Sequence, residues 1–99
     1  MKHVLRLAAA ALLTLPLSVA AGDPAAGKAK ATICVTCHGA DGIGTQPEYP
    51  NLAGQQEAYL VISTKAYRDG ARDDKLMKMW VMNLTDEDIA DIAAYYAGL

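Results

Sequence analysis

Aromatic side chains are scarce in this chain of 99 residues, which has no phenylalanine, one tryptophan and five tyrosines. A domain of this size has little apolar area to bury, and its core alone supplies only about 3–5 kcal/mol. The composition therefore favours a bound group that adds apolar mass to the core. Alternating apolar and polar runs typical of strands are also missing, so the expected fold class is all-α.

The first 20 residues have the pattern of an export signal. Lys2, His3 and Arg6 give a basic start, residues 7–17 are almost wholly apolar, and Ser18-Val19-Ala20 supplies small residues for cleavage. The apolar part is too short and too rich in alanine for a membrane span of about 20 residues. We therefore expect residues 1–20 to be a signal peptide and residues 21–99 to be the mature domain, without stable membrane insertion.

The mature chain is small and acidic. Cleavage after Ala20 removes Lys2 and Arg6 and leaves 79 residues, in which 7 basic side chains stand against 11 acidic ones for a net charge of −4. Such a balance argues against nucleic acid or an anionic membrane surface as the main partner. The length corresponds to one domain.

Cysteine and histidine are equally scarce, yet they occur together. The chain has two cysteines and two histidines, and His3 leaves with the signal. Cys34, Cys37 and His38 form a C-x-x-C-H run, the attachment signature for haem c. In this arrangement the two thiols bond the vinyl groups of one porphyrin, and the histidine ligates its iron. We predict one covalent haem c on Cys34 and Cys37, with His38 as an axial iron ligand.

Other uses of the cysteine pair fit less well. A thioredoxin-like redox pair needs a preceding strand and a βαβ context, whereas this pair follows a helical pattern. A structural zinc site usually needs four Cys or His ligands, and the mature chain has three. A plain disulfide or chance spacing is the alternative that remains.

The single mature histidine restricts the second axial ligand of the iron, because two histidines from one chain are excluded. The position is either open, as in gas-binding or catalytic haems, or filled by methionine, which raises the reduction potential of electron-transfer cytochromes. All three mature methionines, Met77, Met79 and Met82, lie in one stretch that we expect to be a loop. Their alternative role is as adaptable core side chains.

Three helical segments are expected. The first starts with Asp23 as N-cap and Pro24 at the first helical position, and continues to Ile33. The second covers about residues 55–69 and stops at Gly70. Residues 39–54 between them are predicted to be loop, because glycine and proline recur there.

The third helix has the clearest signals. Thr85-x-x-Asp88 resembles a capping box, and an apolar stripe with helical spacing follows at Ile89, Ile92, Ala93 and Tyr96. The acidic side chains around its start, Asp86, Glu87, Asp88 and Asp91, are interpreted as a capped and solvated helix face rather than a metal site.

Over essentially the whole mature length, the chain resembles small class I c-type cytochromes, in particular single haem modules of bacterial periplasmic cytochromes. The resemblance is carried by Cys34-Val35-Thr36-Cys37-His38-Gly39 with Asp41-Gly42, by Tyr49-Pro50-Asn51-Leu52-Ala53-Gly54-Gln55, and by residues 84–96. It implies the small cytochrome c fold, in which three main helices wrap around one haem.

The resemblance also implies roles for single residues. The axial methionine of the family commonly precedes the leucine at the start of the last helix by seven residues, which corresponds to Met77 before Leu84. Some short members have a separation of five, so Met79 is the alternative. The proline that matches Pro50 accepts a hydrogen bond from the axial histidine through its carbonyl. Gly27 and Tyr95 are expected where the first and last helices cross.

Two filled axial positions leave no coordination site for a substrate, so we expect an electron-transfer protein and not an enzyme. The predicted function is a periplasmic one-electron carrier whose redox protein partners bind transiently. The alternative is a cytochrome subunit of a larger oxidoreductase, such as a flavoprotein dehydrogenase. A gas-binding or peroxidatic haem is a third interpretation, which requires that no methionine ligates the iron.

Overall fold

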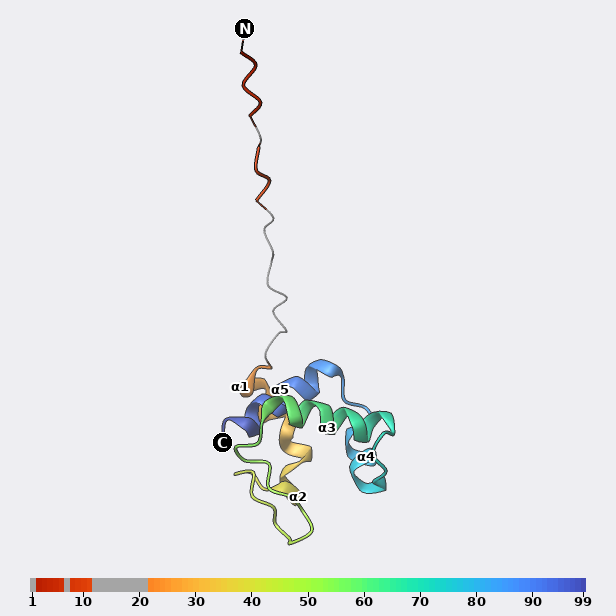
Figure 1. Cartoon of the computed structure of the whole chain (residues 1–99). Helices are drawn as coiled ribbons and strands as arrows, with labels where there is room; N and C mark the ends of the chain where they lie inside the picture. Colours follow the sequence, from red (N-terminus) through yellow and green to blue (C-terminus); the bar gives the residue numbers. More distant parts are fainter. Residues whose placement is uncertain (1, 7, 12–21) are drawn as a thin grey trace.

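The computed structural model describes residues 2–6, 8–11 and 22–99, and this part of the chain contains helices and no strand. The cleavage site expected after Ala20 falls in residues 12–21, outside the described residues. Among the helices described, none has the length and apolar character needed to cross a membrane. The elements in chain order (Figure 1) are α1 Pro24–Lys30, the 3₁₀ turn η1 Ala31–Ile33, α2 Val35–His38, α3 Glu57–Asp69, α4 Lys75–Val81 and α5 Asp86–Ala97.

The first predicted helix exists, but it is interrupted before the cysteine pair. Asp23 caps α1 as expected, because its side chain accepts a 2.9 Å hydrogen bond from the N–H of Ala25. After Lys30 the chain tightens into η1, where the N–H of Cys34 donates to the carbonyl of Ala31 at 2.8 Å. A 3₁₀ turn has fewer residues per turn than an α-helix. The change rotates α2 relative to α1 and thereby sets the direction of the residues that follow.

The second predicted helix is α3, which begins at Glu57, two residues later than expected. Its predicted end is confirmed, because Gly70 has φ of 92° and donates its N–H to the carbonyl of Ala66. Only glycine adopts that left-handed conformation without steric cost.

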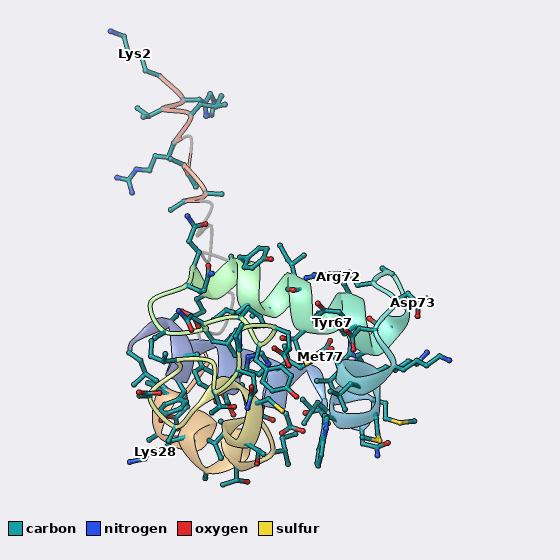
Figure 2. The ribbon with its side chains drawn as sticks, turned by 90° about the horizontal axis from the view of Figure 1, so that it is seen from below. Lys2, Lys28, Tyr67, Arg72, Asp73 and Met77 are labelled. Atoms are coloured by element: carbon teal, nitrogen blue, oxygen red, sulfur yellow. The ribbon has the colours of Figure 1, made fainter. Side chains whose placement is uncertain are left out.

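The prediction of a loop around the methionines is wrong, because residues 75–81 form the helix α4. Asp74 starts this helix, since its carboxylate accepts a 2.9 Å hydrogen bond from the N–H of Met77. Figure 2 shows Met77 on this short helix, close to the chain reversal that follows α3. The aspartate before Lys75 was the available signal, but seven residues are too few for a clear apolar period.

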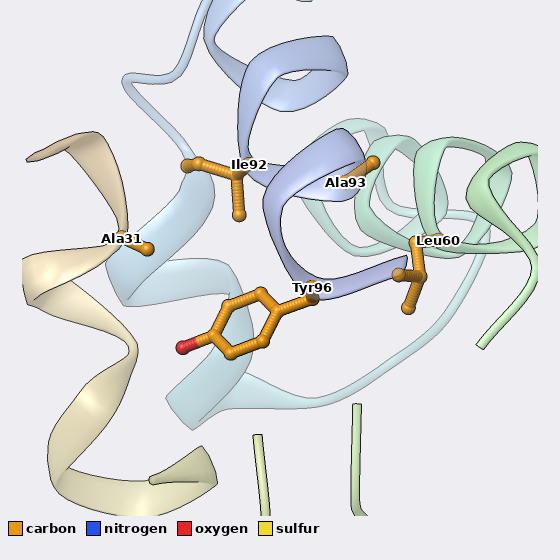
Figure 3. Packing of buried hydrophobic residues seen from close by; sticks show 5 residues of the cluster. All are labelled: Ala31, Leu60, Ile92, Ala93 and Tyr96. Carbon is orange, nitrogen blue, oxygen red and sulfur yellow. The ribbon is translucent and has the colours of Figure 1, made fainter. Parts of the chain in front are cut away.

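The predicted capping box of the last helix is confirmed. The hydroxyl of Thr85 accepts from the N–H of Asp88, and the carboxylate of Asp88 accepts from the N–H of Thr85, both at 3.0 Å. The apolar stripe of α5 is the centre of the core, where Ile92, Ala93 and Tyr96 are buried together with Ala31 and Leu60. Figure 3 shows these α5 side chains between Ala31 on one side and Leu60 on the other.

The expected crossing of the first and last helices at Gly27 and Tyr95 is also confirmed. Gly27 is buried against α5, and a Cβ atom at this position would collide with the backbone carbonyl of Asp91 and lie 3.0 Å from Cβ of Tyr95. Glycine destabilises a helix relative to alanine, but here only a residue without a side chain lets the backbones of α1 and α5 approach so closely.

One acidic residue of the last helix does not belong to a solvated face, which corrects the interpretation from sequence. Asp91 is 5% exposed, and its carboxylate accepts from Nζ of Lys30 at 2.7 Å and from the N–H of Asp23 at 2.8 Å. Lys30 also pairs with Asp88 at 2.9 Å. This network joins both ends of α1, its N-cap Asp23 and its last residue Lys30, to α5. Hydrogen bonds from Lys30, and then from the Asp23 backbone, hold the pKa of Asp91 below its ordinary value.

A carboxyl whose pKa is lowered in the folded state stabilises the fold above its unfolded pKa, and this contribution disappears as the pH falls through the folded pKa. We therefore expect Asp91→Asn to be less stable than the unsubstituted holoprotein at pH 7. The difference should shrink as the pH falls below about 4, where unfolded aspartates protonate. Denaturant unfolding at several pH values measures it.

Asp73→Asn is the matched control, because Asp73 is exposed and makes no ion pair or side-chain hydrogen bond with the residues described. It should leave stability and its pH dependence unchanged. A difference for Asp91→Asn that stays constant down to pH 2 would show that the lost contribution is packing and not ionic.

Candidate functional site

A cavity of about 450 Å³ lies between α2, α3, α4 and the loop that follows α2. Its wall combines apolar side chains of α3, α4 and the loop, and Ile92 of α5, with a few polar groups. The residues named in the sequence prediction that line it are Cys34, Cys37, His38, Pro50 and Met77. The C-x-x-C-H motif, the predicted proline and one of the three methionines thus meet around a single space.

His38 is the last residue of α2 and is 7% exposed. Its Nδ1 atom lies 2.9 Å from the carbonyl oxygen of Pro50. Because a carbonyl can only accept, Nδ1 carries the ring proton, and the lone pair of a neutral imidazole is then on Nε2. This contact fixes the ring orientation and leaves Nε2 as the atom that can bind a metal.

The loop that carries Pro50 is held by hydrogen bonds rather than by a core of its own. The carbonyl of Gly42 accepts from the N–H groups of Leu52 and Ala53 at 2.8 and 3.0 Å. Gly42 has φ of 76°, and a Cβ atom there would lie within 3 Å of Ala53. The side chain of Asn51 adds a hydrogen bond from the N–H of Gly44 at 2.8 Å. The Pro50 carbonyl is therefore preorganised before any ligand binds.

Two tyrosines of α5 connect the last helix to the segment after His38. The hydroxyl of Tyr95 donates to the carbonyl of Ala40 at 2.8 Å, and that of Tyr96 donates to the carbonyl of Gly39 at 3.4 Å. Burial, and then the nearby Cys34 and Tyr95, raise the pKa of Tyr96, so its hydroxyl stays a donor. These two hydrogen bonds hold the residues that follow α2 in place against α5.

The two cysteines are free thiols, both half-buried at the cavity wall. Burial, with a smaller contribution from Cys37, raises the pKa of Cys34 to about 11. Cysteines of thioredoxin-like and nucleophilic sites have lowered pKa values, because they react as thiolates. The environment of Cys34 has the opposite effect and does not fit redox catalysis by a thiolate.

The three methionines differ in their placement on α4 and directly after it. Met77 is half-buried and lines the cavity, as does Val81 one turn later. Met79 and Met82 are 57% and 54% exposed and do not contribute to the wall. Because of the helical period, Met77 is the one of these three methionines whose side chain lines the cavity.

Sequence reasoning overlooked several side chains of the wall, among them Ser63, Tyr67 and Arg72. The first two lie on the face of α3 that borders the cavity, and Arg72 follows the glycine that ends this helix. A basic residue just beyond a helix stop has no distinctive sequence signal, because its function depends on how the chain turns back.

The residues around the cavity fit a covalently attached porphyrin. Two neighbouring thiols, one imidazole nitrogen free to ligate and one thioether border the same space, and the cavity is large for a domain of this size. By contrast, the described residues contain no group of three or more His, Cys, Asp or Glu side chains placed to hold a bare metal ion.

The family model for cytochrome c matches residues 24–99, so the chain belongs to the cytochrome c family. It is a haem c protein of the all-α cytochrome c fold that transfers electrons and is not an enzyme. Cys34 and Cys37 are the two cysteines present for the covalent attachment that this family implies.

This chain covers nearly all of one similar protein and about half of others. Cytochrome c-554(548) of Halomonas halodenitrificans is 58% identical over 80 residues, which cover 78% of this chain and 96% of the relative. Cytochrome c4 of Pseudomonas aeruginosa is 50% identical over 95 residues, or 93% of this chain and 47% of the relative. The thiosulfate dehydrogenase electron acceptor of Thiomonas intermedia is 35% identical over 102 residues, and 45% of it is covered.

Among solved structures, that of reduced recombinant cytochrome c4 from Pseudomonas stutzeri superposes with a TM-score of 0.73 at 37% identity. The match covers 78% of this chain and 45% of that one. The chain therefore spans about half the length of the cytochrome c4 relatives, and nearly all of cytochrome c-554(548).

The cavity predicts that the chain needs its haem to fold. Without the haem, the apolar side chains that line this cavity of about 450 Å³ would face water, and a domain of this size has little other core to stabilise it. We expect the haem-free variant Cys34→Ala/Cys37→Ala to be largely unfolded, whereas the holoprotein melts cooperatively. Thermal melting followed by circular dichroism compares the two, and a cooperative transition in the haem-free variant would contradict this expectation.

Proposed function

We propose that this chain is an exported one-electron carrier in which His38 and Met77 are the axial ligands of a single haem c. The observation that carries the proposal is the placement of Met77, the one mature methionine that lines the cavity containing His38. The exposure of Met79 and its absence from the wall support Met77 over Met79 as the ligand.

The protein's own groups prepare both sides of the iron site. The Pro50 carbonyl accepts the Nδ1 proton of His38, which orients the ring and increases the basicity of Nε2. Asp74 fixes the first turn of α4 by accepting from the N–H of Met77, so the thioether approaches from a rigid element. When bound, haem c supplies one-electron chemistry between its ferric and ferrous states. Ligands held in the same place in both states keep the rearrangement on electron transfer small.

Electron exchange also requires that partners approach the bound group. Leu76 and Trp80 belong to the cavity wall, yet they are 46% and 48% exposed. The wall at α4 is therefore thin, and it supports exchange through transient contact with redox proteins. The basic start, apolar stretch and small residues of positions 1–20 support export to the periplasm.

The ferric absorption spectrum tests the axial ligand. Met77→Ala should lose the weak sulfur-to-iron band and have a lower reduction potential, because methionine ligation raises it. Met79→Ala is the matched control and should keep both properties, since its side chain is exposed. Loss of the band in the Met79 variant alone would show that Met79, and not Met77, is the axial ligand.

Carbon monoxide binding separates the carrier from a gas-binding or peroxidatic haem. A reduced protein with both axial positions filled should bind carbon monoxide poorly at neutral pH. Ready binding by the unsubstituted protein would contradict the carrier and favour an open coordination site.

The second candidate function is that of a dedicated cytochrome subunit with one fixed oxidoreductase partner. It is favoured by the similarity to proteins named thiosulfate dehydrogenase electron acceptors. We expect the chain to purify from native extract without a partner at high salt, because transient contacts between redox proteins are small. A partner that remains bound through a salt wash would instead support the subunit.

A further inference from the structure

Apart from Met1, the methionines of this chain all lie between positions 77 and 82, yet their side chains face different surroundings. Met77 lies on the side of α4 that faces α3, where it lines the cavity together with Tyr67 (Figure 2). Met79 and Met82, the exposed pair, are 57% and 54% exposed and do not line the cavity. The same chemical group thus occurs once at the site and twice at the outer surface beside it.

The exposed pair occupies one face of α4. This helix ends at Val81, but the N–H of Met82 still donates to the carbonyl of Lys78 at 2.9 Å, and the φ and ψ angles of Met82 are −59° and −27°. The helical period therefore continues to Met82. Because residues three apart on a helix are neighbours, Met79 and Met82 present two thioethers side by side to solvent.

This face borders the thin part of the cavity wall. Leu76 and Trp80 line the cavity from α4, although they are 46% and 48% exposed. Trp80 directly follows Met79 in the chain. A small solute that reaches Met77 from this side therefore approaches over the short helix that carries the exposed pair.

Core packing does not explain the exposed pair. Methionine usually fills irregular gaps in a core, whereas more than half of the surface of each of these residues is open to solvent. At an exposed position methionine differs from leucine chiefly in its sulfur atom, which two-electron oxidants convert to a sulfoxide. An exposed sulfur is also reached more readily by such an oxidant than a buried one.

We propose that Met79 and Met82 are a modification site, whose thioethers react first with oxygen-transferring oxidants such as hypochlorous acid and thereby protect Met77. The inference rests on the proposed ligation of the haem iron by Met77, since oxidation of that sulfur would remove the ligand. In the reaction the thioether sulfur loses two electrons and bonds the oxygen atom, while the chlorine of hypochlorous acid is reduced to chloride and a proton is released. Met77 reacts more slowly because it is half-buried and because ligation occupies a lone pair of its sulfur.

Oxidation of the exposed pair changes little inside the protein. A sulfoxide is polar and disrupts a core, but at an exposed position its oxygen is hydrated. Neither residue belongs to the cavity wall or to the contact between His38 and Pro50. The modified protein should therefore keep its axial ligands and its reduction potential. Methionine sulfoxide reductases reverse the modification, so the pair can be used again.

Limited oxidation of the ferric holoprotein tests the order in which the methionines react. Hypochlorous acid is added in substoichiometric steps, the remaining oxidant is quenched, and the protein is denatured and digested. Trypsin cleaves after Lys75 and Lys78 and therefore separates Met77 from the exposed pair. Mass spectrometry should find the added oxygen on the exposed pair while the Met77 peptide is unmodified and the sulfur-to-iron band persists. Fragment ions distinguish these sulfoxides from an oxidised Trp80.

The variant Met79→Leu/Met82→Leu measures the protection, because leucine replaces methionine at similar volume without sulfur. The band should disappear at a lower dose of oxidant, and the difference should equal the amount that the exposed pair consumes in the unsubstituted protein. Ile62→Leu is the control, since Ile62 is 67% exposed, contains no sulfur and does not line the cavity. It should lose the band at the same dose as the unsubstituted protein.

Two results would overturn the proposal. One is oxidation of Met77 at the first additions of oxidant, and the other is loss of the band at the same dose in the double variant and in the unsubstituted protein. A band that is absent from the untreated protein would instead refute ligation by Met77, and the peptide masses would still give the order in which the three methionines react.

Discussion

The volume kept open between α2, α3 and α4 is the constraint on which the rest of the structure depends. A chain with so few aromatic residues does not fill this space itself, and without a bound group the apolar wall of this cavity of about 450 Å³ would face water. The haem that the family implies is therefore part of the core, and attachment through Cys34 and Cys37, the two cysteines present for it, would make it permanent. The remaining elements serve to hold the walls of this space at a fixed separation.

Two sets of contacts, on opposite sides of the cavity, hold its walls at this separation. Gly27 lets α1 approach α5, and the Lys30–Asp91 pair joins the same two helices. The tyrosines of α5 then donate to the carbonyls directly after His38, so that the position of this proposed axial ligand follows from the packing of the last helix. On the far side, the short helix α4 depends on its Asp74 cap, which acts on the N–H of Met77 itself.

Local signals in the sequence were sufficient to predict those features whose residues lie close together in the chain. The C-x-x-C-H run, the cap at Asp23 and the capping box at Thr85 each lie within five residues, and the structure has the caps as expected. Features that depend on the path of the chain have no such signal: α4 is too short to show a period, the burial of Asp91 depends on how α1 crosses α5, and Arg72 lies beyond a helix stop. The choice of Met77 came from family resemblance, and its place on the wall follows from the helix that sequence reasoning overlooked.

Iron-edge X-ray absorption provides the most direct test of ligation by His38 and Met77. The informative sample is the ferric holoprotein of Met79→Leu/Met82→Leu, in which Met77 is the one methionine left besides Met1. The account predicts a sulfur neighbour of the iron beside the porphyrin and imidazole nitrogens, because the two cysteine sulfurs bond carbon and not the metal. A coordination sphere of nitrogen and oxygen alone would contradict it.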